Sequence, residues 1–263
     1  MKHMLHTEKK GAGTPVVLLH GFATSHKYWN RVSQRLPIQS VQIVAPDILG
    51  FGLSHKPKDG LYDVDHHADS IVRNVLLDIG RPVILVGHSM GAMIATRIAK
   101  KHPELVARLV LVNMPTFTDK EQAQKLVLGS QSIFHKAYVS PLGRAAHAGL
   151  DTRVGKKIHR MLYASRPHKQ DIASEYFTHS RASFLRSLHN TIIGYQPLED
   201  LHDLTLPVSV IYSEDDRYYS KSALSKIKAD KVKLVHLAGG HHLPLKQDKY
   251  LADFIVAEAK QIA

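Results

Sequence analysis

The pentapeptide Gly87-His88-Ser89-Met90-Gly91 is the first stretch whose residue types indicate chemistry. An apolar run at 83–86 precedes it and a helical pattern follows, which is the context in which G-x-S-x-G presents a nucleophile. A turn sharp enough to expose a serine hydroxyl strains its backbone, and side chains at 87 and 91 would collide with neighbouring elements. The pattern predicts that Ser89 is an exposed nucleophile and that the Met90 amide faces charge developing beside it.

A second loop, His20-Gly21-Phe22-Ala23, follows the apolar run at 15–19, which is typical of a parallel strand covered on both faces. A glycine after such a strand marks a tight loop. Beside the serine turn, this loop predicts that the Phe22 amide joins the Met90 amide in an oxyanion hole. We expect His20 to brace the loop by hydrogen bonding.

Two polar residues near these loops are predicted to be structural. His88 lies inside the serine turn but faces the wrong way to activate Ser89, so we expect it to pack beneath the turn. Asp47 opens a glycine-containing turn at 47–54, where a carboxylate typically accepts hydrogen bonds from local backbone amides.

A serine hydroxyl needs an adjacent base, and the base needs a carboxylate that orients it. Such groups converge at the carboxyl ends of parallel strands. The predicted strand at 207–212 runs into the acidic loop 213–217, and the strand at 232–237 runs into the loop 239–244, which holds two histidines. The chain therefore offers the order serine, aspartate, histidine.

Strand and helix patterns alternate along most of the chain, which predicts an α/β fold with a doubly wound, mostly parallel sheet. The predicted strands are 3–7, 15–19, 41–45, 83–86, 106–113, 207–212 and 232–237. The predicted helices are 29–36, 65–79, 90–102, 220–228 and 248–262.

The alternation breaks between 115 and 196, where the pattern is mostly helical. We therefore expect a core formed by 1–114 and 197–263, and a helical cap at 115–196 that covers the Ser89 pocket and limits substrate length. The candidate inward-facing residues of the cap are Leu126, Ile133, Phe134, Leu162 and Phe184.

Composition narrows the class of protein. At 263 residues with 44% hydrophobic side chains, the chain can bury a large core. Its lack of cysteine excludes disulfides, thiolate metal sites and cysteine nucleophiles, and the spacing of its 19 histidines matches no metal motif. The formal net charge of +12 is scattered without a nucleic-acid-binding motif, so we expect a solvated basic surface and no nucleic-acid partner. Without a leader-like start or an apolar run of about 20 residues, a cytoplasmic location and no membrane partner are expected.

Together these ordered motifs resemble the α/β-hydrolase fold superfamily, in its lid-bearing serine esterase type. The resemblance covers nearly the whole chain. The family's acid usually ends a G-E-x-D motif; here Ser213 replaces the glycine, and the match places the acid at Asp216, with Asp215 as the alternative. The family's G-x-x-H motif before an apolar residue and proline places the base at His242, with His241 as the alternative.

The resemblance implies hydrolysis of carboxylic esters through an acyl-enzyme on Ser89, with no cofactor or metal and a small-molecule ester as the partner. Carbon–carbon bond hydrolases, lactonases and cofactor-free perhydrolases share this triad and stay open as alternatives. The family's dehalogenases and epoxide hydrolases use an aspartate where this chain has Ser89, and its carbon–carbon hydrolases often carry asparagine where this chain has His88. A non-enzymatic receptor of the same fold is the alternative from a different class. The sequence does not define the oligomeric state.

Overall fold

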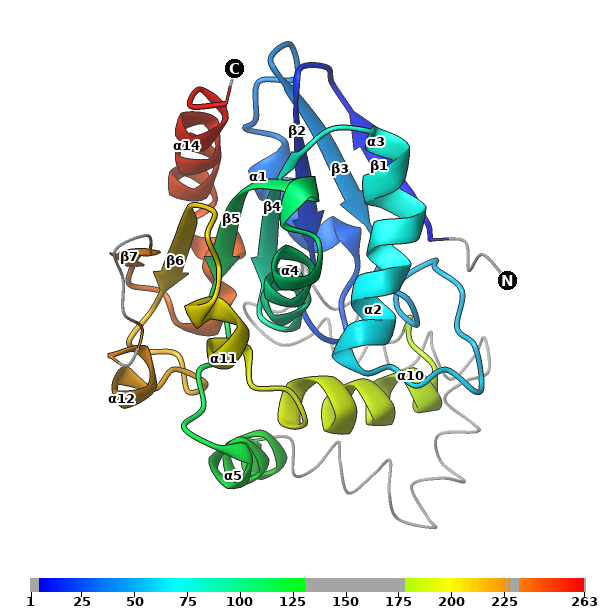
Figure 1. Cartoon of the computed structure of the whole chain (residues 1–263), viewed down its shortest axis with the longest axis vertical. Helices are drawn as coiled ribbons and strands as arrows, with labels where there is room; N and C mark the ends of the chain where they lie inside the picture. The colour runs from blue at the N-terminus through cyan, green and yellow to red at the C-terminus, as the bar shows by residue number, and fades with distance from the viewer. Residues whose placement is uncertain (1–4, 131–177, 226, 228–231, 263) are drawn as a thin grey trace, which may run out of the picture.

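The computed structural model describes residues 5–130, 178–225, 227 and 232–262 (Figure 1). Its strands form one seven-stranded sheet in the order β1-β3-β2-β4-β5-β6-β7. β1 (Thr7–Lys10) pairs antiparallel with β3 (Val41–Pro46), and all the other neighbours are parallel. The remaining strands are β2 (Thr14–Leu19), β4 (Val83–His88), β5 (Val106–Val112), β6 (Val208–Tyr212) and β7 (Val232–His236).

Helices cover both faces of the sheet, because alternate strand residues point to opposite sides. On β2, Val17 and Leu19 join one buried cluster, whereas Val16 and Leu18 join the other. The first cluster includes residues of α2 (Val64–Ile71), η2 (Val72–Leu76) and α4 (Met90–Lys101), and the second includes residues of α1 (Asn30–Ser33) and α14 (Asp248–Ala259). The other helical elements are η1 (His26–Trp29), α3 (Leu77–Ile79), η3 (Pro103–Leu105), α5 (Lys120–Ser130), α10 (Arg181–Arg186), η4 (Ser187–Ile193), α11 (Pro197–His202), α12 (Lys221–Leu224), η5 (Gly240–His242) and α13 (Leu243–Lys246).

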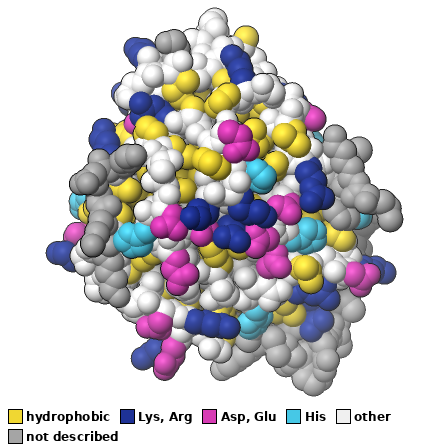
Figure 2. Space-filling model, in the orientation of Figure 1, with side chains coloured by type: hydrophobic (Ala, Val, Ile, Leu, Met, Phe, Trp, Pro, Cys, Tyr) yellow, Lys and Arg dark blue, Asp and Glu magenta, His cyan; other side chains and the backbone are white. Residues whose placement is uncertain are grey.

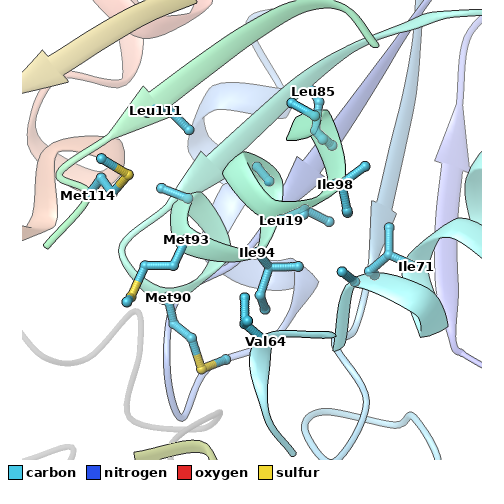
Figure 3. Close-up of a cluster of buried hydrophobic side chains, with 14 of the residues drawn as sticks. Leu19, Val64, Ile71, Leu85, Met90, Met93, Ile94, Ile98, Leu111 and Met114 are labelled. Atoms are coloured by element: carbon cyan, nitrogen blue, oxygen red, sulfur yellow. The ribbon is translucent and has the colours of Figure 1, made fainter. Parts of the chain in front are cut away.

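The helix that follows Ser89 is held in place by apolar packing. Met90, Met93, Ile94 and Ile98 of α4 are all fully buried, and they face side chains of the central strands and of α2 (Figure 3). Burial of one such side chain contributes about 1.5–3 kcal/mol. The start of α4, and with it the serine turn, is therefore fixed relative to the sheet.

The predicted alternation of strands and helices is confirmed, with differences at the chain ends and helix limits. The edge strand predicted at 3–7 begins outside the described residues, which start at 5, and the described strand β1 runs from Thr7 to Lys10. The strand extends to the turn because Gly11 and Gly13 take positive φ angles that begin the return toward β2. The helix predicted at 220–228 is shorter, since α12 ends at Leu224, and residues 226 and 228 of the predicted helix lie outside the described part.

The predicted cap falls partly within the described residues. α5, α10 and η4 are helical, as expected for this segment, and Figure 1 shows them beyond the carboxyl ends of the strands. Phe184 is 5% exposed, and Leu126 packs against the same cluster as α4. Residues 131–177, which include Ile133, Phe134 and Leu162, lie outside the described part, so the division into core and cap stays a prediction.

Acidic and basic side chains are interspersed on the face shown in Figure 2. Arg97 of α4 bridges Asp65 of α2 at 2.8 Å and Asp200 of α11 at 3.0 Å. Lys100 and Lys101 add further ion pairs to acidic groups on α2 and beside α11. Positive charge on α4 is thus paired locally.

Every helix in the described part of the chain is too short or too polar to span a membrane.

Candidate active site

Ser89 occupies a strained turn between β4 and α4, with φ of 53° and ψ of −120°. The two glycines around it are required by close packing. A Cβ on Gly87 would lie 2.4 Å from the Gly91 carbonyl oxygen, and a Cβ on Gly91 would lie 2.4 Å from the Leu19 carbonyl oxygen. The predicted steric role of both glycines is confirmed, and this backbone holds the hydroxyl at the carboxyl edge of the sheet. The predicted exposure of Ser89 is wrong: the residue is 7% exposed, because the loops around the turn pack closely over it.

The Ser89 hydroxyl lies at one end of a series of hydrogen bonds. Its Oγ is 3.0 Å from His241 Nε2, and His241 Nδ1 is 2.7 Å from Asp216 Oδ2. With Nδ1–H donated to the carboxylate, Nε2 is left as the acceptor for the serine proton. The three side chains come from three loops, which follow β4, β6 and β7.

The structure contradicts the placement of the base at His242. His241 makes both hydrogen bonds, whereas His242 Nδ1 lies 3.0 Å from the hydroxyl of Tyr28. Gly240 explains the shift of one residue: it takes a positive φ of 65°, and its amide donates to Ser213 Oγ at 3.0 Å. The chain turns at this glycine, so the very next side chain faces Asp216.

Between the two candidate acids, the structure brings Asp216 into the series. Asp216 is 4% exposed, whereas Asp215 is exposed to solvent. Burial alone would raise the pKa of Asp216, but the hydrogen bond and charge of His241, with hydrogen bonds from the Tyr218 amide and Asn113, hold that pKa below its ordinary value. Asp216 is therefore a stable anion, able to orient an imidazole and stabilise its protonated form.

Asn113 is a site residue to which no sequence motif assigns a role. It directly follows β5 with a φ of 47°, and its Nδ2 donates to Asp216 Oδ2 at 2.9 Å. The same Nδ2 lies 3.4 Å from the carbonyl oxygen of Gly240, and so reaches the loop that carries His241. A polar residue at the end of a predicted parallel strand was the available signal.

The loop after β2 lies against the serine turn. A Cβ on Gly21 would lie 3.4 Å from Ser89 Cβ, so the neighbouring Phe22 amide belongs to a backbone segment beside the hydroxyl. Met90 is the first residue of α4, where amides lack acceptors inside the helix. His20 braces this loop as predicted: its Nε2 accepts the Ile48 amide at 2.9 Å, which leaves Nδ1–H to donate to the Gly21 carbonyl at 2.8 Å.

His88 is buried beneath the turn, as predicted, at 2% exposure. Its Nε2 lies 2.8 Å from the carbonyl oxygen of His241, which makes Nε2–H the donor. Burial, followed by the proximity of His241, keeps the pKa of His88 well below its ordinary value. Tyr28 stacks on the His88 ring, with centroids 4.7 Å apart. His88 therefore supports the loop of His241 and makes no bond to Ser89.

Aromatic rings pack against the loop at 20–23 that follows β2. The Phe22 ring lies 4.6 Å from the ring of Phe184 on α10 and 5.9 Å from that of Phe51, centroid to centroid. The His179 ring contacts Phe184 at 4.9 Å. The described end of the predicted cap thus packs directly onto the loop that faces Ser89.

Comparison with known proteins agrees with this architecture. The profile of the Alpha/beta hydrolase family matches residues 16–254. The probable lysophospholipase BODYGUARD 4 of Arabidopsis thaliana is 31% identical over 212 residues, which are 73% of this chain and 49% of that protein. The 2-hydroxymuconate semialdehyde hydrolase of Pseudomonas sp. (strain CF600) is 42% identical over 107 residues, which are 39% of this chain and 37% of that protein. The chain spans about half, or less, of the length of these relatives.

Solved structures extend the similarity to nearly the full chain. An esterase from Exiguobacterium antarcticum superimposes with a TM-score of 0.74 at 20% identity, covering 97% of this chain and 95% of that one. The enol-lactonase from Burkholderia xenovorans LB400 gives a TM-score of 0.72 at 17% identity, covering 96% and 95%. At these identities the likeness shows the fold alone.

Proposed function

The chain belongs to the alpha/beta hydrolase family, and from this premise we propose that it is a serine hydrolase that cleaves carboxylic esters. The observation that carries the proposal is the series Ser89–His241–Asp216, with contacts of 3.0 Å and 2.7 Å. It joins the hydroxyl of Ser89, in its strained turn, to the imidazole of His241, and that imidazole to the buried carboxylate of Asp216. That is the arrangement a serine nucleophile requires.

The proposed reaction runs in two halves. His241 Nε2 takes the Ser89 proton as Oγ attacks the ester carbonyl, and the Phe22 and Met90 amides stabilise the oxyanion. The tetrahedral intermediate expels the alcohol, which receives the proton from His241 and leaves the acyl group on Ser89. A water then gives a proton to His241 and attacks the acyl carbon; Ser89 leaves with that proton and the acid is released. Asp216 stabilises the imidazolium in both halves.

For the substrate we propose an uncharged ester with a short or medium acyl chain. Phe22, Phe51 and Phe184 form an apolar aromatic group beside the loop at 20–23, and apolar rings favour an uncharged acyl group. A helical cover over such a site excludes water and limits chain length. The expected order of kcat/KM is butyrate or octanoate above palmitate, measured with p-nitrophenyl esters. A clear preference for palmitate would instead favour a lysophospholipase-like substrate, as the name of the Arabidopsis thaliana relative indicates for that protein.

The test of the mechanism is Ser89→Ala. The variant should fold normally and lose kcat by a factor on the order of 10⁴ to 10⁶. A fluorophosphonate probe should label the wild-type protein and the exposed-surface control Ser225→Ala, and fail to label Ser89→Ala. Retention of more than a tenth of the wild-type turnover would overturn the assignment of the nucleophile. Failure of the wild type to react would instead favour a receptor of the same fold.

A second candidate is carbon–carbon bond hydrolysis, which the identity of 42% to the 2-hydroxymuconate semialdehyde hydrolase favours over 107 residues. The same side chains would serve it, with a carbon leaving group that must be protonated. A β-diketone and a lactone, assayed beside the ester panel, separate the reactions. Turnover of the β-diketone well above that of every ester would replace the ester proposal with this one.

A further inference from the structure

A second histidine–aspartate pair lies outside the Ser89 series. Asp47 follows β3 and is fully buried. Its Oδ1 accepts the His26 amide at 2.7 Å and lies 2.8 Å from His26 Nδ1, while its Oδ2 accepts the Leu53 amide at 2.7 Å. The predicted bonding of Asp47 to local amides is confirmed, and these amides hold its carboxylate in one orientation.

His6 completes the group from a third segment of the chain. Its ring centroid is 5.0 Å from that of His26, and one potential ligand atom from each of His6, His26 and Asp47 lies within 4.8 Å of the others. The backbone of His6 is anchored on both sides: its amide donates to Ser54 Oγ at 2.9 Å, and its carbonyl accepts the Asp47 amide at 2.8 Å. The three side chains are thus held together by the fold.

From this geometry we propose that His6, His26 and Asp47 form a binding site for a late first-row divalent cation such as Zn²⁺. Two imidazole nitrogens and one carboxylate oxygen are a donor set that suits Zn²⁺, Co²⁺ or Ni²⁺, with water in the remaining positions. The two amides that orient Asp47 supply the outer hydrogen bonds that such carboxylates require.

His26 and Asp47 need little rearrangement to reach a metal, and the potential ligand atom of His6 lies within 4.8 Å of theirs. Bonds of about 2.0–2.2 Å place ligand atoms about 3–3.5 Å apart, a spacing that His26 and Asp47 already approach at 2.8 Å. The cation would take the place of the proton between these two groups, and that proton would move to His26 Nε2.

His6 is the residue that distinguishes a metal site from a simple ion pair. His26 and Asp47 would make their contact without any metal, whereas the ring of His6 takes part in no hydrogen bond recorded for the described residues. A bound cation would tie the chain before β1 to η1 and to the turn after β3, and would stabilise the folded state in proportion to its occupancy.

The experiment titrates metal-depleted protein with ZnCl₂ by calorimetry and with CoCl₂ by visible absorption. Because other histidines among the 19 in the chain can also bind metal, the affinity of the tightest site is compared between each variant and a matched control variant. His6→Ala and His26→Ala should each weaken the tightest site at least about tenfold and abolish the rise in Tm on adding zinc. His236→Ala, which removes an exposed histidine, should leave both unchanged.

Two outcomes would overturn the site. One is a tightest site and a zinc-dependent Tm that are the same in His6→Ala and in the wild type. The other is loss of the tightest site in His241→Ala with its retention in His6→Ala, which would place the ion at the Ser89 series. His6→Ala is the decisive variant because it leaves the His26–Asp47 hydrogen bond intact and so should fold.

Discussion

Two buried aspartates in this molecule each contact a histidine. The side chain that lies on the other side of each histidine decides what that pair can do. The His241–Asp216 contact is 2.7 Å and the His26–Asp47 contact is 2.8 Å. Both aspartates follow parallel strands, and both accept backbone amide protons. At the first pair the imidazole meets a serine hydroxyl, whereas at the second the neighbour is another imidazole. The first can move a proton to and from substrate, and the second can only share one or exchange it for a metal.

The largest effect should separate the adjacent histidines of the first pair. His241→Ala removes the imidazole that contacts Ser89 and should lower kcat about 10⁴-fold. His242→Ala breaks the contact with Tyr28 and should cost far less, within about tenfold. Steady-state kinetics of the two variants with p-nitrophenyl butyrate measure the difference. If the losses were reversed, the base would be His242 and the comparison of the two pairs would fail.

A second experiment replaces each of the two aspartates, one at a time, with asparagine. Asp216→Asn should lower kcat by about 10⁴, because the amide keeps the shape of the carboxylate and loses the charge that orients His241. Asp47→Asn should leave kcat nearly unchanged and lower the stability of the fold. It weakens the hydrogen bonds from two backbone amides and the contact with His26 at a fully buried position, which should lower the free energy of unfolding by about 2–4 kcal/mol. Thermal melts and kinetics of both variants test this. Equal losses of kcat would show that Asp47 acts on the reaction.

The sequence predicted the serine turn because short-range sterics decide it. Gly87 is required by backbone atoms of Gly91 and Ala92 in the same turn, and Gly91 by backbone atoms at the end of the neighbouring strand β2, so the fixed spacing of both glycines around Ser89 reveals the turn. The alternation of strands and helices was predictable for a similar reason, since residues buried on both faces of a parallel strand form continuous apolar runs.

The position of the base was not predictable in this way. His241 and His242 are adjacent. The φ angle of Gly240, and the hydrogen bond from its amide to Ser213 Oγ, determine which of the two contacts Asp216. Asn113 and His6 were missed because their partners are distant in the chain. Asn113 donates to a residue 103 positions away, and the ligands His6, His26 and Asp47 have no motif spacing.

The smallest expected effect concerns a buried histidine whose partner is a hydroxyl. It shows how an imidazole behaves when no carboxylate contacts it, in contrast to the two histidine–aspartate pairs. His67 of α2 is fully buried, and its Nε2 lies 3.0 Å from Ser187 Oγ on η4. Burial, followed by the nearby His66 and His20, lowers the pKa of His67 to about 3. In the unfolded chain the pKa returns to about 6.5, so between pH 6.5 and 3 the unfolded state binds one more proton than the folded state.

Because the unfolded state takes up the proton, the contribution of neutral His67 to stability is complete above pH 6.5 and declines as the pH falls toward 3. One proton corresponds to a slope of up to about 1.4 kcal/mol per pH unit. His67→Gln keeps a partner for Ser187 and should flatten the dependence of the unfolding free energy on pH by that amount between pH 6 and 4.5, measured by urea titration. The exposed-histidine variant His236→Ala should keep the wild-type slope, and a His67→Gln slope as steep as the wild type would mean that His67 binds a proton in the folded protein.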